Sequence, residues 1–292
     1  MWMAAARYAC IAAAWASFVL AAGASPAHAA GASPAHAAGG INLEGIAVQG
    51  SLMIGRVEVG AKLWLDDVPV AVAKYGEFLL GFGRNAGRKA RIKVTFADGR
   101  TASRLLHIEQ REFKIERIDG LEPKKVTPSP EDLERIRAET ALIDKARARF
   151  TEKSYFRSGF IWPVQGRVSG VYGSQRVLNG EARAPHLGVD VAAPKGSLVV
   201  AAADGVVSLS YNGMFFSGNV MVIDHGLGLG SIYAHLERLL VKEGQRVEQG
   251  QPIGTVGATG RVTGPHLHWG VNLFRVGLDP ALLVPAMPAA GK

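Results

Sequence analysis

The sequence predicts a mainly β protein with a small N-terminal β-sandwich, a helical linker, and a C-terminal antiparallel sheet or open barrel. Short alternating apolar segments recur, separated by Gly- or Asp-containing turns, as in all-β domains. Only one stretch, near 130–150, has the period and the capping residues of a helix. The chain has 292 residues and 36 glycines, which fits two domains with many tight turns.

The first segment, 1–38, is expected to be a secretory signal peptide. Arg7 is the only charged residue before Glu44, and the apolar run 11–22 is short for a membrane span, which needs about 20 residues. The octet GASPAHAA occurs at 23–30 and again at 31–38, so two cleavage positions remain open. We therefore expect an exported protein with no stable membrane span after cleavage.

Composition narrows the chemistry of the mature chain. The single cysteine, Cys10, lies in the signal segment, so disulfides, thiol nucleophiles and cysteine metal ligands are excluded. Without Arg7, the 33 basic residues become 32 against 25 acidic ones, a net charge of +7. This charge favours an anionic partner, although it fits a generally soluble basic surface equally well. No nucleic-acid recognition motif is present, and no nucleic acid is expected as a partner.

Residues 39–121 are expected to form the β-sandwich, and its short strands suggest the immunoglobulin-like kind. Strand pairs flank Asp66-Asp67 and Asp98-Gly99, and an Asp-Gly pair is a strong hairpin signal. The segment REFKIERI, 111–118, alternates polar and apolar residues and is assigned to the same sandwich. His107 stands alone on a predicted strand and is expected to be structural.

Residues 122–151 are expected to be a Pro-rich linker followed by a helix from about 130 to 150. Ser129 suits the N-cap, Pro130 suits the first helical position, and acidic residues follow in the first turn. The helix could act as a spacer or could pack on either domain.

In the C-terminal region, 152–292, histidines fall on predicted strands. In HLHWGVNL, strict alternation places His266 and His268 on one face, about 7 Å apart. In SIYAHL, Tyr233 and His235 are expected to share a face. On a straight strand His186 and Asp190 would be about 13 Å apart, so the chain must bend between them, and Gly188 offers that freedom.

Two imidazoles and one carboxylate form a ligand set that suits zinc. Three protein ligands leave one tetrahedral position open, which is typical of catalytic sites rather than structural ones. Because the sequence has no H-E-x-x-H motif, no glutamate on a helix is available as a base. The remaining histidines are expected to carry protons and to stabilise a developing oxyanion.

The motifs HLGVD, YAHL and GPHLHWG, in this order, resemble those of the lysostaphin/LytM-type zinc metallopeptidases. The resemblance covers about 160–285, including WPVQGRVSGVYGSQR, AADGVV and VEQGQPIGTVGATG. It implies Zn²⁺ on His186, Asp190 and His268, with His235 and His266 as a non-ligand catalytic pair. Members cleave peptide cross-links of bacterial cell-wall peptidoglycan, and some relatives that have lost ligands act as activators of wall amidases.

Further site residues and the function are also expected. Tyr233 and Arg176 are candidates for substrate binding, and His225 is expected to be structural or to support the ligands. The expected function is zinc-dependent endopeptidase activity on peptidoglycan stem peptides, with D,D specificity. The alternative is a non-catalytic periplasmic activator of cell-wall amidases. A biotinyl- or lipoyl-type carrier is disfavoured, since no Lys lies between Gln245 and His268.

The N-terminal region resembles, more loosely, the immunoglobulin-like domain of some proteobacterial relatives. This indicates the periplasm of a Gram-negative bacterium. A further partner in the cell wall or the division machinery fits the same setting.

Overall fold

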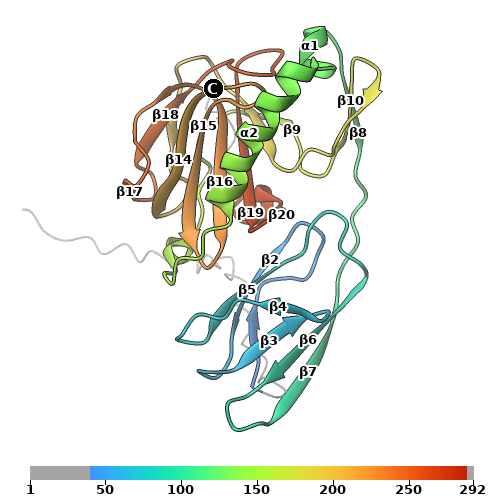
Figure 1. Ribbon diagram of the computed structural model, residues 1–292, viewed down its shortest axis with the longest axis vertical. Coiled ribbons are helices and arrows are strands. Elements are labelled where there is room, and N and C mark those ends of the chain that lie inside the picture. Colours follow the sequence, from blue (N-terminus) through green and yellow to red (C-terminus); the bar gives the residue numbers. More distant parts are fainter. Residues whose placement is uncertain (1–39, 288–292) are drawn as a thin grey trace, which may run out of the picture. The chain divides into compact units, whose positions relative to one another are not determined.

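The computed structural model describes residues 40–287, and it confirms a mainly β protein (Figure 1). The segment 1–38, expected to be a signal peptide, lies outside the described residues. Within 40–287, no helix combines the length and the hydropathy needed to cross a membrane.

The N-terminal β region contains two antiparallel sheets, with strand orders β1-β2-β5 and β4-β3-β6-β7. Their apolar side chains meet in one core that includes Phe78 and Ile92. The strands are β1 (Asn42–Glu44), β2 (Leu52–Arg56), β3 (Lys62–Leu65), β4 (Val68–Val70), β5 (Glu77–Gly81), β6 (Lys89–Thr95) and β7 (Thr101–His107).

Both expected hairpins of this region are present. β3 and β4 pair around Asp66 and Asp67, whose φ angles are 48° and 68°, as a type I′ turn requires. β6 and β7 pair across the turn that contains Asp98 and Gly99. Buried and exposed residues alternate along β6, so one face of this hairpin packs on the core.

The strand β8 (Ile115–Ile118) corrects the expected boundary of the sandwich. It pairs in parallel with β10 (Gln175–Leu178), which also pairs with β11 (Glu181–Ala182). The alternating segment 111–118 was assigned to the sandwich because alternation predicts a strand with one buried face. Alternation does not reveal which strand is the partner.

The helix α2 (Pro130–Arg147) begins as predicted. Asp132 N donates to Ser129 Oγ over 3.1 Å, and Pro130 occupies the first turn. Ile143 and Ala146 pack against the C-terminal sheet, which decides between the placements that the sequence left open. The remaining helical segments are α1 (Pro123–Val126), η1 (Tyr155–Ser158) and η2 (Pro280–Leu282).

The C-terminal domain is built on a ten-stranded sheet whose main path runs β17-β14-β15-β16-β19-β12-β9. β18 pairs with β13 and β16, and β20 pairs with β19. The strands are β9 (Arg167–Gly170), β12 (Val189–Ala192), β13 (Leu198–Val200), β14 (Gly205–Met214), β15 (Gly218–Gly226), β16 (Leu229–Leu239), β17 (Arg246–Val247), β18 (Pro252–Val256), β19 (His266–Leu273) and β20 (Val276–Leu278).

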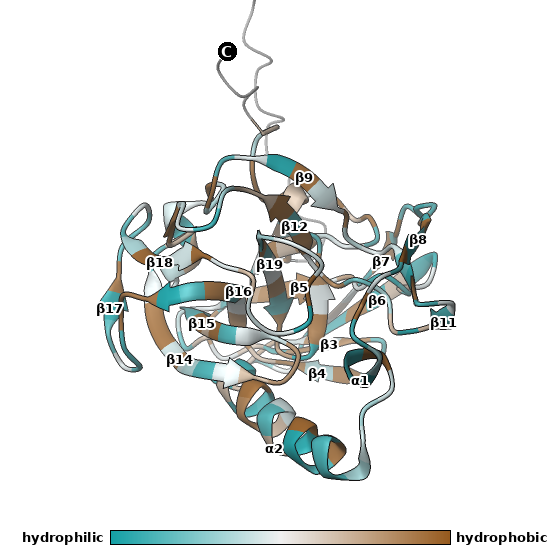
Figure 2. Ribbon diagram, turned by 90° about the horizontal axis from the view of Figure 1, so that it is seen from above, coloured by the Kyte–Doolittle hydropathy of each residue, from teal (hydrophilic) through white to brown (hydrophobic). Residues whose placement is uncertain are grey.

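The two faces of this sheet differ. One face forms the main core around Val191, Leu267 and Trp269. On the other face, α2 packs over β14 and β15, and its ribbon in Figure 2 shows both hydrophobic and hydrophilic stretches. A groove lies between α2 and the strands β16 and β19, and its lining includes Ile143, Ala234 and His268.

Candidate metal centre

Three side chains converge beside this groove. His186 precedes β12, Asp190 lies on β12, and His268 lies opposite Asp190 on β19. His186 Nε2 is 2.9 Å from His268 Nδ1 and 3.1 Å from Asp190 Oδ1, and His268 Nδ1 is 2.8 Å from Asp190 Oδ1. These are the three residues that the resemblance implied as ligands, and the fold brings them together.

The donor set fits a zinc ion. Ligand atoms at about 2.0–2.1 Å from tetrahedral zinc lie roughly 3.4 Å apart, and all three atoms here are within 4.8 Å of one another. His186 Nδ1 lies 3.2 Å from Val171 O. A donor at Nδ1 leaves the Nε2 lone pair of this ring for a metal, as is usual for ligating histidines.

Gly188 allows His186 and Asp190 to lie close together, but not through the backbone freedom that the sequence analysis expected. Its φ is not positive, so the bend does not depend on a left-handed backbone. Instead, a Cβ at this position would lie 2.7 Å from His268 Cε1 and 2.7 Å from Trp269 O. Glycine is therefore required by the close approach of β19 and its ligand.

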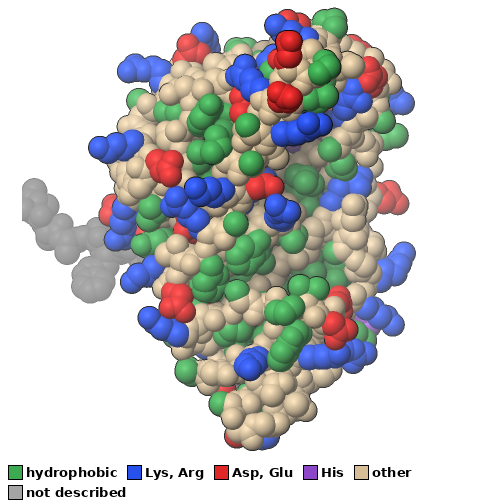
Figure 3. Space-filling model, in the orientation of Figure 1, with side chains coloured by type: hydrophobic (Ala, Val, Ile, Leu, Met, Phe, Trp, Pro, Cys, Tyr) green, Lys and Arg blue, Asp and Glu red, His purple; other side chains and the backbone are tan. Residues whose placement is uncertain are grey.

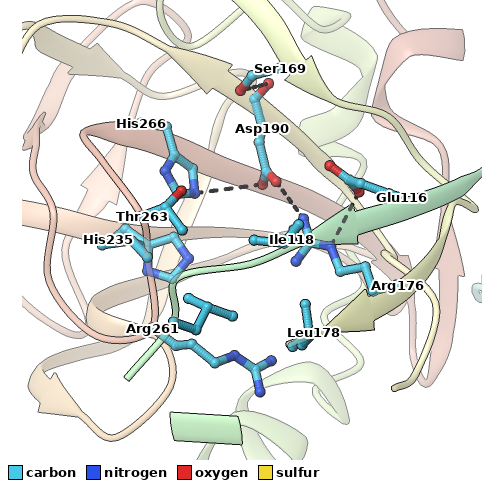
Figure 4. A pocket seen from close by; sticks show the side chains of 12 residues that line it. Glu116, Ile118, Ser169, Arg176, Leu178, Asp190, His235, Arg261, Thr263 and His266 are labelled. Carbon is cyan, nitrogen blue, oxygen red and sulfur yellow. Dashed lines mark hydrogen bonds and ion pairs between the residues drawn. The ribbon is translucent and has the colours of Figure 1, made fainter. Parts of the chain in front are cut away.

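His235 and His266 lie beside the three-residue cluster, with ring centroids 4.8 Å apart. His235 Nδ1 is 2.9 Å from Thr259 O, and His266 Nδ1 is 2.9 Å from Gly264 O. Each ring is therefore fixed through Nδ1 by a backbone carbonyl. Both rings line the pocket shown in Figure 4, where His266 Nε2 lies 3.9 Å from Asp190 Oδ1.

Tyr233 does not share a face with His235, and this expectation is wrong. Tyr233 is fully buried in the main core, where its hydroxyl accepts from Ala202 N at 2.9 Å. His235 has a φ of 64°, which interrupts the alternation and turns its ring towards the groove. Because Tyr233 lines no cavity described around the metal cluster, it is removed from the candidate substrate contacts.

Arg176 approaches the cluster from β10. Its Nη2 lies 2.5 Å from Asp190 Oδ2, while Oδ1 of the same carboxylate faces the two histidines. Arg176 Nε also lies 3.5 Å from Glu116 Oε2 on β8, as Figure 4 shows. Arg176, the expected substrate contact, is thus paired with two carboxylates, and it would orient Asp190 if this residue binds a metal.

Burial and contacts shift the protonation of these groups. Burial alone would raise the pKa of Asp190, but hydrogen bonds from His186 and His268 hold this pKa well below its usual range. Burial lowers the pKa of His268 to about 4 against the opposing effect of Asp190. Burial and repulsion from His266 and His268 lower the pKa of His235 to about 3. His235 and His268 are therefore neutral at pH 7, as metal binding and proton acceptance require.

His225 is structural, as expected. It is fully buried behind the sheet, with Nδ1 2.6 Å from Asp204 O and Nε2 2.7 Å from Ser231 Oγ. Burial lowers its pKa to about 4. His107, the other histidine expected to be structural, is exposed at the end of β7.

The sequence analysis did not identify several residues that line the site. A cavity of about 170 Å³ beside His235 and His266 is also lined by Glu116 and Ile118 from β8 and by Leu121, which follows β8. A wider groove of about 720 Å³ extends along α2, and Figure 3 shows a hollow on this side with Lys and Arg side chains near it. No motif marks Glu116, Ile118 and Leu121, because the pairing of β8 with β10 brings them to the site.

Comparison with protein families gives a match in the C-terminal region. The family model described as Peptidase family M23 matches residues 184–280, which include all five residues of the cluster and the histidine pair. In a solved structure, a Pseudomonas aeruginosa chain assigned to peptidase M23 superposes with a TM-score of 0.64 at 29% identity. The superposition covers 82% of this chain and 95% of that one.

Two curated relatives carry informative names. The peptidoglycan DD-endopeptidase ShyC of Vibrio cholerae is 46% identical over 140 residues, which are 44% of this chain and 31% of ShyC. The murein hydrolase activator NlpD of Salmonella dublin is 32% identical over 150 residues, 51% of this chain and 38% of NlpD. The chain thus spans between 24% and 38% of the length of the curated relatives it matches.

Proposed function

We propose that the protein, whose residues 184–280 match the model of Peptidase family M23, is a zinc-dependent endopeptidase that hydrolyses peptide cross-links of bacterial cell-wall peptidoglycan. The observation that carries the proposal is the pairing of a three-ligand cluster with two further histidines. His186, Asp190 and His268 form the cluster. His235 and His266 lie beside it with Nδ1 of each ring on a backbone carbonyl, and His266 Nε2 is 3.9 Å from Asp190 Oδ1. A purely structural zinc site would not need this second pair.

The bond to be cleaved is proposed from the relatives. ShyC is named a peptidoglycan DD-endopeptidase, which agrees with the D,D specificity implied by the sequence resemblance. The groove is open along α2, so an extended peptide can cross the cluster without a buried entrance. The same relatives support an exported protein of a Gram-negative periplasm.

The chemistry of the reaction is hydrolysis of an amide. When bound, a zinc ion supplies Lewis-acid chemistry that polarises the scissile carbonyl and lowers the pKa of the attacking water. The water oxygen forms a bond to the carbonyl carbon, and the carbon–nitrogen bond then breaks. The proton lost by the water must finally reach the leaving amine.

His235 and His266 are the groups that move this proton. Because Nδ1 of each ring is held by a backbone carbonyl, Nε2 of either ring can accept the proton from the attacking water. The imidazolium formed in this way then donates the proton to the leaving nitrogen. The second ring can stabilise the negative charge that develops on the carbonyl oxygen when its own Nε2 carries a proton that it donates to that oxygen.

The alternative is a non-catalytic activator of wall amidases, and the match to NlpD keeps it open to experiment. The residues favour the enzyme, since all five positions implied for zinc binding and proton transfer are filled. In either case the partner is the cell wall, with a wall or division protein as a further proposed partner.

The test is incubation of the mature chain, 39–292, with purified peptidoglycan, with and without a zinc chelator, followed by mass spectrometry. We expect cross-linked muropeptides to become monomers only when zinc is present. A zinc-loaded protein that releases no products would contradict the proposal and favour the activator.

A further inference from the structure

The cavity beside the histidine pair has one apolar wall and one cationic end. Its volume is about 170 Å³, and a cavity of about 150 Å³ is enough to hold one benzene molecule. Ile118, Leu121 and Leu178 supply the apolar wall. Arg261 supplies the cationic end, and in Figure 4 its side chain extends past His235 towards Leu178.

Arg261 has no anionic partner among residues 40–287. Its Nη1 donates to Lys125 O over 3.3 Å, and its guanidinium lies 4.2 Å from the ring centroid of Phe216. Both contacts hold the side chain in place, but neither one neutralises it. The guanidinium therefore keeps donors free for a ligand, since arginine has five.

The other cations near the cavity are already neutralised. Arg176 is paired with Glu116 and Asp190, and Arg183 is paired with Glu181. The acidic groups that line the cavity, Glu116 and Asp190, are thus occupied by Arg176. Arg261 is left as the uncompensated positive charge of the cavity.

The pKa of Arg261 is consistent with a positive charge that has no anionic partner among the described residues. Burial, together with repulsion from Arg176 and Arg183, lowers the pKa of Arg261 to about 10. The side chain is still charged at neutral pH, but its environment disfavours the charge. A bound anion would relieve this unfavourable environment.

We propose that this cavity is a specificity subsite that binds a free carboxylate on a short aliphatic stem of the substrate peptide, next to the scissile amide. The inference rests on the proposed function and names the feature of the peptide that this site selects. Arg261 forms the paired hydrogen bonds that a carboxylate accepts from a guanidinium. Ile118, Leu121 and Leu178 cover the methylene groups of the stem.

The test compares two soluble cross-linked peptides that differ in one group. One peptide carries the free carboxylate beside the scissile bond, and in the other this group is a primary amide. The zinc-loaded full chain should cleave the carboxylate peptide with the higher kcat/KM, mainly through a lower KM. Arg261→Met should lower that kcat/KM by about 10- to 100-fold, the effect of losing a hydrogen bond to a charged group, and should abolish the preference.

Two further variants make the result specific. Arg261→Lys keeps the charge but loses the planar fork, so it should retain part of the preference and report on the site even if Arg261→Met folds poorly. Arg238→Met removes an equal charge from an exposed position on β16 that lines no described cavity, and both peptides should be cleaved as by the wild type.

Equal cleavage of the two peptides by the wild type, or a preference that survives in Arg261→Met, would overturn the subsite while leaving the proposed function intact. Cleavage of neither peptide by zinc-loaded wild type would overturn the proposed function and the subsite together.

Discussion

Replacing Gly188 with alanine tests whether close packing around the metal cluster sets its geometry. The new Cβ would lie 2.7 Å from Cε1 and 2.9 Å from Nε2 of His268, and 2.7 Å from Trp269 O. Ordinary contacts of this kind begin at 3.4 Å, so the shortfall is 0.5 to 0.7 Å. Because Trp269 O belongs to the backbone of β19, the neighbouring strands must move, and the His268 ring must move with them.

The size of this movement determines the expected effect. Metal sites tolerate deviations of about 0.2 Å in their ligand distances, so a shift of this size should weaken zinc binding about 10- to 100-fold, as the loss of a supporting contact does. Overpacking should also reduce the free energy of unfolding by about 1–3 kcal/mol.

The assay is competition for zinc against a chromophoric chelator, together with denaturant unfolding of the metal-free protein. Gly264→Ala is the matched control, because a Cβ at Gly264 would meet nothing within 4 Å and its φ is not positive. If Gly188→Ala bound zinc and unfolded like the wild type, the steric argument would be refuted.

Three further predictions concern single side chains. His186→Ala should abolish both zinc binding and activity, whereas His235→Ala should keep zinc and lose about 10²–10⁴-fold in kcat; metal content and turnover measured together would expose an error in either role. Arg176→Met should raise the zinc Kd about 10- to 100-fold by releasing Oδ2 of Asp190, with partial recovery in Arg176→Lys, and an unchanged Kd would remove Arg176 from this role. Folding lowers the pKa of His225 from 6.5 to about 4. Between these two pH values the ring is protonated in the unfolded chain and neutral in the folded chain. Stability should therefore drop by about 3 kcal/mol between pH 7 and pH 4 on account of this ring, and His225→Gln should show a shallower decline in chemical denaturation at each pH.

Local signals in the sequence were sufficient for several elements. The helix after Ser129 depends on a hydroxyl that accepts from a nearby backbone N–H and on a proline at the first turn, and both act within four residues. The hairpin at Asp66 and Asp67 depends on backbone angles of those two residues. In both cases the determining contacts are close in the chain.

Other features depend on contacts between distant segments. The alternation of 111–118 predicted a strand, but the partner β10 lies about 60 residues further along the chain, from Gln175 to Leu178. The strand SIYAHL suggested that Tyr233 and His235 share a face. The positive φ of His235 separates them, and no residue type in that motif signals such a backbone.

The sequence by itself determined the donor types and their spacing: two histidines two residues apart on a strand, a third on another strand, and a histidine–aspartate pair. These patterns predicted a metal site, because strand periodicity assigns side chains to faces, and the family resemblance implied which of the residues are the ligands. The tertiary structure alone decided how Asp190 is held, since its second oxygen meets Arg176 from β10, which in turn meets Glu116 from β8. The tertiary structure also decided the surroundings of Arg261. Its burial and its distance from Arg176 and Arg183 depend on segments that become neighbours only when the chain folds.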